Sequence, residues 1–151
     1  MSDDLWVWGS NATEPRILHA MIRVADLERS LGFYCGALGM RKLVQHDVPA
    51  GKFSIAFVSF SSDYESGAIE LTHNWESPAN DEGYSHGSGY GHIAIGVPDV
   101  PGTCARLRSA GIDITVEPKI LFPGGPSLAF VKDPDGYSIE LIQTSRDYPG
   151  I

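Results

Sequence analysis

Histidine and glutamate lie close together in the segment IELTHNW, residues 69–75. In a helix, Glu70 and His73 would be neighbours on one face, a spacing that can hold a metal ion. In a β-strand, the two side chains point to opposite faces of the sheet and cannot share one ion. The secondary structure of this segment therefore decides which residues could do metal chemistry.

An internal repeat bears on this question. Three pairs of segments match in the same order along the chain: HAMIRVADL (19–27) with HIAIGVPDV (92–100), SIAFV (54–58) with SLAFV (127–131), and IEL (69–71) with IEL (139–141). The first two pairs share an offset of 73 residues and the third has an offset of 70, a difference that a loop can absorb. The chain is therefore interpreted as a duplicated module of roughly 60 to 70 residues.

Each module is predicted to have the order βαβββ, which gives an α+β fold. Residues 17–24 alternate as a strand does, Asp26 can cap a helix over 27–38, and Gly39 can end that helix. The other expected elements are strands at 42–48, 52–60 and 67–75, then a strand at 92–97, a helix at 101–110 and strands near 113–117, 127–131 and 137–143. Segment 69–75 follows a turn and is too short for a typical helix, so we expect it to be a strand.

The expected organisation has four parts: an N-terminal arm at 1–16, one module at 17–75, a polar Gly- and Ser-rich linker at 76–91, and a second module at 92–145.

The repeat selects four candidate metal ligands. In each module a histidine opens the first strand and a glutamate lies in the last strand: His19 with Glu70, and His92 with Glu140. Imidazole suits first-row transition metals, and two carboxylates balance the charge of a divalent ion. The sequence therefore predicts one metal site built from two equivalent His–Glu pairs.

Strand alternation predicts two neighbours for these ligands. Arg23 shares the face of His19, and Asn74 shares the face of Glu70. A guanidinium and an amide beside a metal suit a substrate that carries carboxylates.

The other histidines and the cysteines are predicted to have no role in the chemistry. His46 and His86 are expected to be solvated, and His73 to be packed or hydrogen-bonded. Cys35 and Cys104 are expected to be buried and inert.

Composition limits the class of protein. The net charge of −8 argues against nucleic acid or an anionic membrane as a partner, and no apolar run is long enough to span a membrane. The acidic start lacks the basic and apolar regions of a secretory signal, and two isolated cysteines suit a reducing compartment. We therefore expect a cytoplasmic protein.

Four segments carry a family resemblance: LHAMIRVADLERSLGFYCGALGM, IELTHNW, YGHIAIGVPDV and FVKDPDGYSIELI. Together they resemble the glyoxalase I (lactoylglutathione lyase) family of the vicinal oxygen chelate superfamily, over residues 17–143. The resemblance implies that paired modules form half-open barrels around the metal, with the site at a homodimer interface. It implies isomerisation of the methylglyoxal–glutathione hemithioacetal to S-D-lactoylglutathione, with glutathione as co-substrate.

Carried over by position, the resemblance makes His19, Glu70, His92 and Glu140 the metal ligands. It makes Glu140 the base, with Glu70 as a ligand or the base for the opposite face. Contacts to the γ-glutamyl end of glutathione fall on Arg23 and Asn74. For the glycyl end, Lys119 is a nearby candidate, and an arginine of the human-type enzyme is replaced by Ser88.

The metal preference implied by the resemblance is nickel or cobalt, with zinc as an alternative. A histidine as first ligand and the short region at 60–67 resemble the compact bacterial type, whereas the linker is closer to the zinc type. Two other functions stay open at this point. One is a different metalloenzyme of the superfamily, a dioxygenase or a thiol transferase acting on fosfomycin; the other is a non-catalytic module that binds a small molecule.

Overall fold

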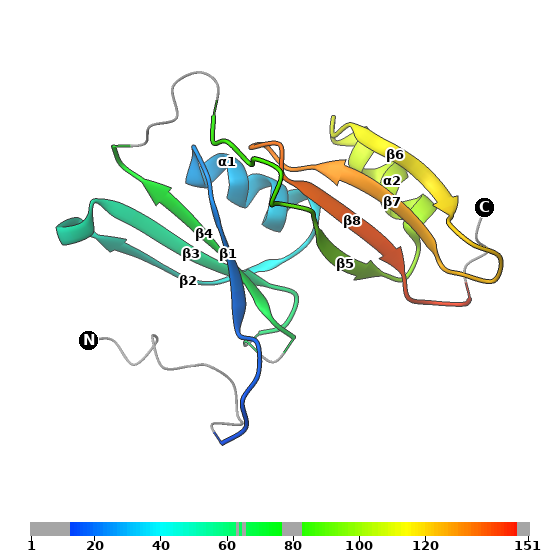
Figure 1. The fold of residues 1–151 in the computed structure, drawn as a ribbon, viewed down its shortest axis with the longest axis horizontal. Helices are drawn as coiled ribbons and strands as arrows, with labels where there is room; N and C mark the ends of the chain where they lie inside the picture. The colour runs from blue at the N-terminus through cyan, green and yellow to red at the C-terminus, as the bar shows by residue number, and fades with distance from the viewer. Residues whose placement is uncertain (1–12, 63, 65, 77–82, 148–151) are drawn as a thin grey trace. The chain divides into compact units, whose positions relative to one another are not determined.

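The structure is a computed structural model that describes residues 13–62, 64, 66–76 and 83–147 (Figure 1). The chain forms two compact units, Met1–Tyr84 and Ser85–Ile151. Each unit is described by itself below. Residues 1–12 of the expected arm and 77–82 of the expected linker lie outside the described residues.

The first unit is a four-stranded mixed sheet with one helical segment. Its elements in chain order are β1 (His19–Arg23), α1 (Leu27–Leu31), the π-helix η2 (Gly32–Ala37), β2 (Arg41–Val48), the 3₁₀-helix η3 (Pro49–Gly51), β3 (Phe53–Ser59) and β4 (Ala68–Asn74). The strand order is β1-β4-β3-β2. Strand β1 is parallel to β4, and the other pairings are antiparallel.

The second unit repeats this topology. Its elements are β5 (Ile93–Val97), α2 (Val100–Ser109), β6 (Ile114–Ile120), β7 (Ser127–Lys132) and β8 (Ser138–Gln143). The strand order is β5-β8-β7-β6, again with the first strand parallel to the last. The prediction of two βαβββ modules is therefore confirmed, and segment 69–75 is a strand, as expected.

The predicted helix caps are present in both modules. The Asp26 carboxylate accepts a hydrogen bond from the backbone N–H of Arg29 at 3.0 Å, and Asp99 accepts one from Gly102 at 3.0 Å. Such bonds satisfy N–H groups that have no partner within the helix. Gly39 follows the first helical segment with φ +83°, a conformation that glycine adopts without strain.

The prediction of one continuous α-helix over 27–38 is wrong in its second half. The α-helical hydrogen bonds end at Leu31, and residues Gly32–Ala37 form a π-helix. In this segment Leu38 N–H donates to the carbonyl of Phe33, five residues earlier. The wider turn still buries Phe33 and Tyr34, so the apolar face of the predicted helix is kept.

The core of each module lies between its sheet and its helix. Leu71 in the first module, and Ile139 and Leu141 in the second, are fully buried on alternate positions of their strands. Helix α2 packs against β6, β7 and β8 (Figure 1), with Leu107 facing the sheet side and almost completely buried. Alternation of apolar residues along these strands thus gives each sheet one apolar face that packs against the helix and an opposite face that does not.

The two cysteines are free thiols with raised pKa values. Cys104 is buried, as predicted, whereas the prediction of a buried Cys35 is wrong, since Cys35 is half-buried. Burial is the main cause that raises the pKa of both thiols. Neither has the depressed pKa that marks a reactive thiol.

Within the described residues, the structure contains no helix with the length and apolar character that crossing a membrane requires.

Candidate metal and substrate site

The first module brings His19 and Glu70 together. Because β1 and β4 are parallel, with Met21 opposite Glu70, the imidazole and the carboxylate reach each other on one face of the sheet. His19 Nε2 lies 3.0 Å from Glu70 Oε2. The Thr72 hydroxyl donates a hydrogen bond of 3.1 Å to the other oxygen, Glu70 Oε1, and so fixes the carboxylate from the same face.

His73 lies on the opposite face from Glu70. Its Nδ1 is 3.3 Å from the carbonyl oxygen of Val24. The prediction that His73 is a hydrogen-bonded strand residue is confirmed. Glu70 and His73 do not form a joint metal site.

The second module brings His92 and Glu140 together in the same way. Ala94 of β5 is opposite Glu140 of β8, as Met21 is opposite Glu70 in the first module. His92 Nε2 lies 3.1 Å from Glu140 Oε2. The Glu140 side chain is 13% exposed, whereas the His92 side chain is 45% exposed, so the carboxylate is the more enclosed member of the pair.

Each of these imidazoles also contacts a phenylalanine ring on the central strand. His19 and Phe57 meet edge to face at 5.1 Å, and His92 and Phe130 do so at 5.5 Å. These rings limit the orientation of each imidazole. The sequence analysis missed them, although both phenylalanines lie in the repeated segments SIAFV and SLAFV.

A third ring extends the packing in the first module. Tyr64 is buried and contacts Phe57 at 5.7 Å. Burial, with a smaller contribution from the Glu70 carboxylate, raises the pKa of Tyr64. Its hydroxyl therefore stays neutral near the carboxylate at physiological pH.

The geometry of each pair fits two ligands of one divalent ion. Two donor atoms that each lie about 2.1 Å from an ion, at right angles, are about 3.0 Å apart. The observed separations of 3.0 and 3.1 Å match this value. Within the described ranges, no group of three or more His, Cys, Asp or Glu side chains is assembled, so each module contributes a pair.

The predicted substrate contacts are placed as follows. Arg23 ends β1 and is exposed, and its neighbour across the sheet is Thr72. Asn74 ends β4 and is half-buried, with its Nδ2 at 3.5 Å from the Tyr84 hydroxyl. Lys119 lies on β6 of the other module and is exposed.

Two predictions about the remaining histidines are wrong. His46 and His86 were expected to be solvated, but both are half-buried and their Nε2 atoms are buried. The ring of His86 stacks on Tyr137, with centroids 4.2 Å apart and planes inclined by 12°. For His86, the prediction is wrong because the ring packs on Tyr137, a residue far along the chain. The Gly- and Ser-rich sequence around His86 does not indicate this contact.

The chain is similar to known proteins over most of its length. Residues 16–141 match the family described as the Glyoxalase/Bleomycin resistance protein/Dioxygenase superfamily. The chain is 50% identical over 129 residues to a protein of Synechocystis sp. named "Probable lactoylglutathione lyase", which covers 85% of this chain and 95% of that protein.

Two solved structures are similar to the chain as well. Glyoxalase I from Zea mays has a TM-score of 0.79 and 40% identity over 86% of this chain, which spans only 45% of that longer protein. The trypanothione-dependent glyoxalase I of Leishmania major has a TM-score of 0.73 and 42% identity, and 87% of its chain is covered. The duplicated βαβββ topology, the repeated His–Glu pairs and these similarities lead to one conclusion: the chain belongs to the glyoxalase I (lactoylglutathione lyase) family of that superfamily.

Proposed function

We propose that this protein isomerises the hemithioacetal of methylglyoxal and glutathione to S-D-lactoylglutathione, using one divalent metal ion per site. The observation that carries the proposal is the pair of equivalent His–Glu arrangements, with Nε2–Oε2 separations of 3.0 and 3.1 Å. We assign His19, Glu70, His92 and Glu140 as ligands. The donor set of two imidazoles and two carboxylates suits a first-row divalent ion, with nickel or cobalt favoured and zinc as the alternative.

The reaction moves a proton from a carbon next to a carbonyl group, so it needs a base and stabilisation of the enediolate charge. When bound, the metal supplies that stabilisation as a Lewis acid. Glu140 is proposed to be the base, because its carboxylate is largely enclosed and lies beside His92, a proposed metal ligand. Removal and return of the proton by one positioned carboxylate is worth roughly 10²–10⁴-fold in rate.

Glu70 is proposed to stay a ligand, or to act as base on the opposite face of the substrate. The hydrogen bond from Thr72 to Glu70 Oε1 supports the ligand role, since it holds this carboxylate in place. Glu140 has no corresponding contact from position 142, which is Ile142. Without such a contact, Glu140 would be the freer of the two carboxylates to move toward the substrate.

The ends of glutathione carry carboxylates, for which basic and amide side chains are suited. Arg23 and Asn74, at the ends of the neighbouring strands β1 and β4, are proposed to bind the γ-glutamyl end. Lys119 is proposed to contact the glycyl end. We further propose a homodimer in which each site takes one module from each subunit.

The direct test follows formation of the thioester by its ultraviolet absorbance, with methylglyoxal and glutathione as substrates. Activity is measured on the purified protein, after removal of metal with a chelator, and after addition of nickel, cobalt or zinc. We expect activity to disappear on chelation and to return with at least one metal. Because the Leishmania major relative is described as trypanothione-dependent, trypanothione is tested as a second thiol. If neither thiol gives thioester with any of the three metals, the proposal is rejected.

A further inference from the structure

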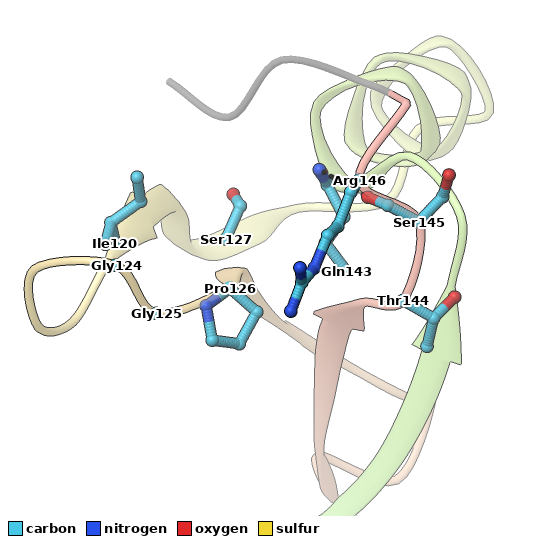
Figure 2. Close-up of a pocket in the computed structure, with 9 residues that line it drawn as sticks. All are labelled: Ile120, Gly124, Gly125, Pro126, Ser127, Gln143, Thr144, Ser145 and Arg146. Atoms are coloured by element: carbon cyan, nitrogen blue, oxygen red, sulfur yellow. Dashed lines mark hydrogen bonds between the residues drawn. The ribbon is translucent and has the colours of Figure 1, made fainter.

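The second module contains a cavity that the proposed reaction does not use. It has a volume of about 580 Å³ and lies where β7 begins and β8 ends (Figure 2). This volume is within the range of sites that hold small molecules. Its lining consists of Ile120, Gly124, Gly125, Pro126, Ser127, Gln143, Thr144, Ser145 and Arg146.

The cavity involves the helix-covered side of the sheet, not the face that carries the His–Glu pair. Along β7, Ser127 alternates with the position of Phe130, whose ring contacts His92. Along β8, Gln143 likewise points away from the face of Glu140. Its Oε1 accepts a hydrogen bond of 3.3 Å from the backbone N–H of Val100, the first residue of α2. The cavity is thus separate from the metal position of this module.

A buried hydroxyl in the cavity has no hydrogen-bond partner. Ser127 is 2% exposed, and its Oγ contacts no donor or acceptor among the described residues. A buried polar group without a partner costs about 1–3 kcal/mol of stability, so such groups are normally satisfied by a ligand or water. The Ser127 hydroxyl is therefore an unsatisfied polar group in the wall of the cavity.

Arg146 supplies the charge. It is the charged residue of this lining, and the structure gives its guanidinium no ion pair with a described carboxylate. Figure 2 shows its side chain lying across the cavity, between the loop that carries Pro126 and the end of β8 that carries Gln143. The neighbouring amide of Gln143 is already engaged, since its Nε2 donates to the Ser145 carbonyl at 3.2 Å. Among the donors of the lining, the guanidinium carries the charge and the Ser127 hydroxyl is the buried one without a partner.

We propose that this cavity binds a small molecule through an anionic group, a carboxylate or a phosphate, which is held by Arg146 and Ser127. A guanidinium offers a planar fork of donors that matches such groups, and a buried hydroxyl adds a further donor. The anionic group can come from a free small anion or from a carboxylate of the thiol co-substrate. Only the second source rests on the function proposed above.

The test is an NMR titration of backbone amides with inorganic phosphate and with acetate, on the full chain. We expect saturable shifts at the amides of Gly124, Gly125 and Ser127. The variant Arg146→Gln loses a charged hydrogen-bond donor and is expected to bind roughly tenfold more weakly. Arg106→Gln, which makes the same charge change on an exposed position of α2, serves as the matched control and is expected to bind as the native protein does.

S-methylglutathione, which cannot react, distinguishes the two sources. If S-methylglutathione shifts the same amides and binds more weakly to Arg146→Gln, the anionic group is a carboxylate of the co-substrate. Shifts with phosphate or acetate alone identify a separate anion. The site is refuted if none of the three probes gives saturable shifts at these amides, or if Arg146→Gln and the native protein bind equally. None of these measurements depends on lyase activity, so failure of this site and failure of the proposed function are told apart.

Discussion

At the scale of single residues, two chemically alike carboxylates occupy equivalent places but different surroundings. Glu70 accepts a hydrogen bond of 3.1 Å from the Thr72 hydroxyl. The position that matches Thr72 in the second module is Ile142, which has no hydroxyl to donate. A hydrogen bond to a carboxylate oxygen restrains the movement of the carboxylate. The two modules therefore offer one restrained and one freer carboxylate, which is what a site with a fixed ligand and a mobile base requires.

The substitution Glu140→Gln tests this division of roles. An amide keeps the shape and an oxygen donor but cannot take up the proton. We expect metal content close to that of the native protein and a fall in kcat of roughly 10²–10⁴-fold. Metal analysis of the purified variant and the thioester assay are the two measurements.

The control for this variant is Glu117→Gln. Glu117 is an exposed residue of β6 paired with Arg108, so its loss is expected to leave kcat unchanged. Near-native turnover by Glu140→Gln would remove Glu140 from the role of base.

The sequence indicates individual candidate residues where the internal repeat places the same residue type at equivalent positions of both modules. His19, Glu70, His92 and Glu140 stand at matching places in the two modules, and alternation along the strands gives their faces. The surroundings of His86 could not be predicted in this way, because its partner Tyr137 is far along the chain and belongs to a different segment. Ring packing of this kind has no local pattern.

At the scale of elements, each helix begins at an aspartate that follows the first strand of its module. Asp26 and Asp99 occupy the same place in the repeat and make the same bond of 3.0 Å to a backbone N–H three residues later.

Replacing Asp26 with Ala is expected to lower the free energy of unfolding by about 1 kcal/mol, since a backbone N–H loses its acceptor. Urea denaturation measures the change. Asp99→Ala should give a loss of similar size, whereas Asp113→Ala, at an exposed position outside the helices, is expected to have little effect. Equal stability of all three variants would show that the caps do not contribute.

The helix at 27–38 shows the limit of sequence prediction for elements. Its cap, its apolar face and its final Gly39 were all predicted, yet Gly32–Ala37 is a π-helix. A π-turn changes the hydrogen-bond partner by one residue and leaves the apolar spacing nearly intact. The periodicity of side chains therefore carries no information about it.

At the scale of the whole molecule, each chain has two His–Glu pairs that are proposed as ligands, one in each module. A site with four ligands needs one His–Glu pair from a first module and one from a second module. In the proposed homodimer, the first module of one subunit meets the second module of its partner, so each dimer contains two sites.

Mixing two inactive variants tests this arrangement. His19→Ala damages the first module, and His92→Ala damages the second. When the two variants are unfolded and refolded together, half of the dimers are mixed, and each mixed dimer has one undamaged site. We therefore expect about one quarter of the native activity and metal content to return, while each variant refolded alone stays inactive.

The control is a mixture of each variant with itself, handled in the same way. If the sites were built from the two modules of a single chain, every site in the mixture would carry one damaged ligand. Absence of recovery in mixtures shown by light scattering to contain dimers would thus contradict the proposed sharing of modules between subunits.

The pairing of each module's first strand with its last has a consequence for how the protein is made. As the chain leaves the ribosome, β1 finds its neighbour in the sheet only after β4 has emerged, and β5 must likewise wait for β8. The amino-terminal unit can therefore close while the second is still being synthesised, in keeping with the general tendency of domains to fold in order of synthesis.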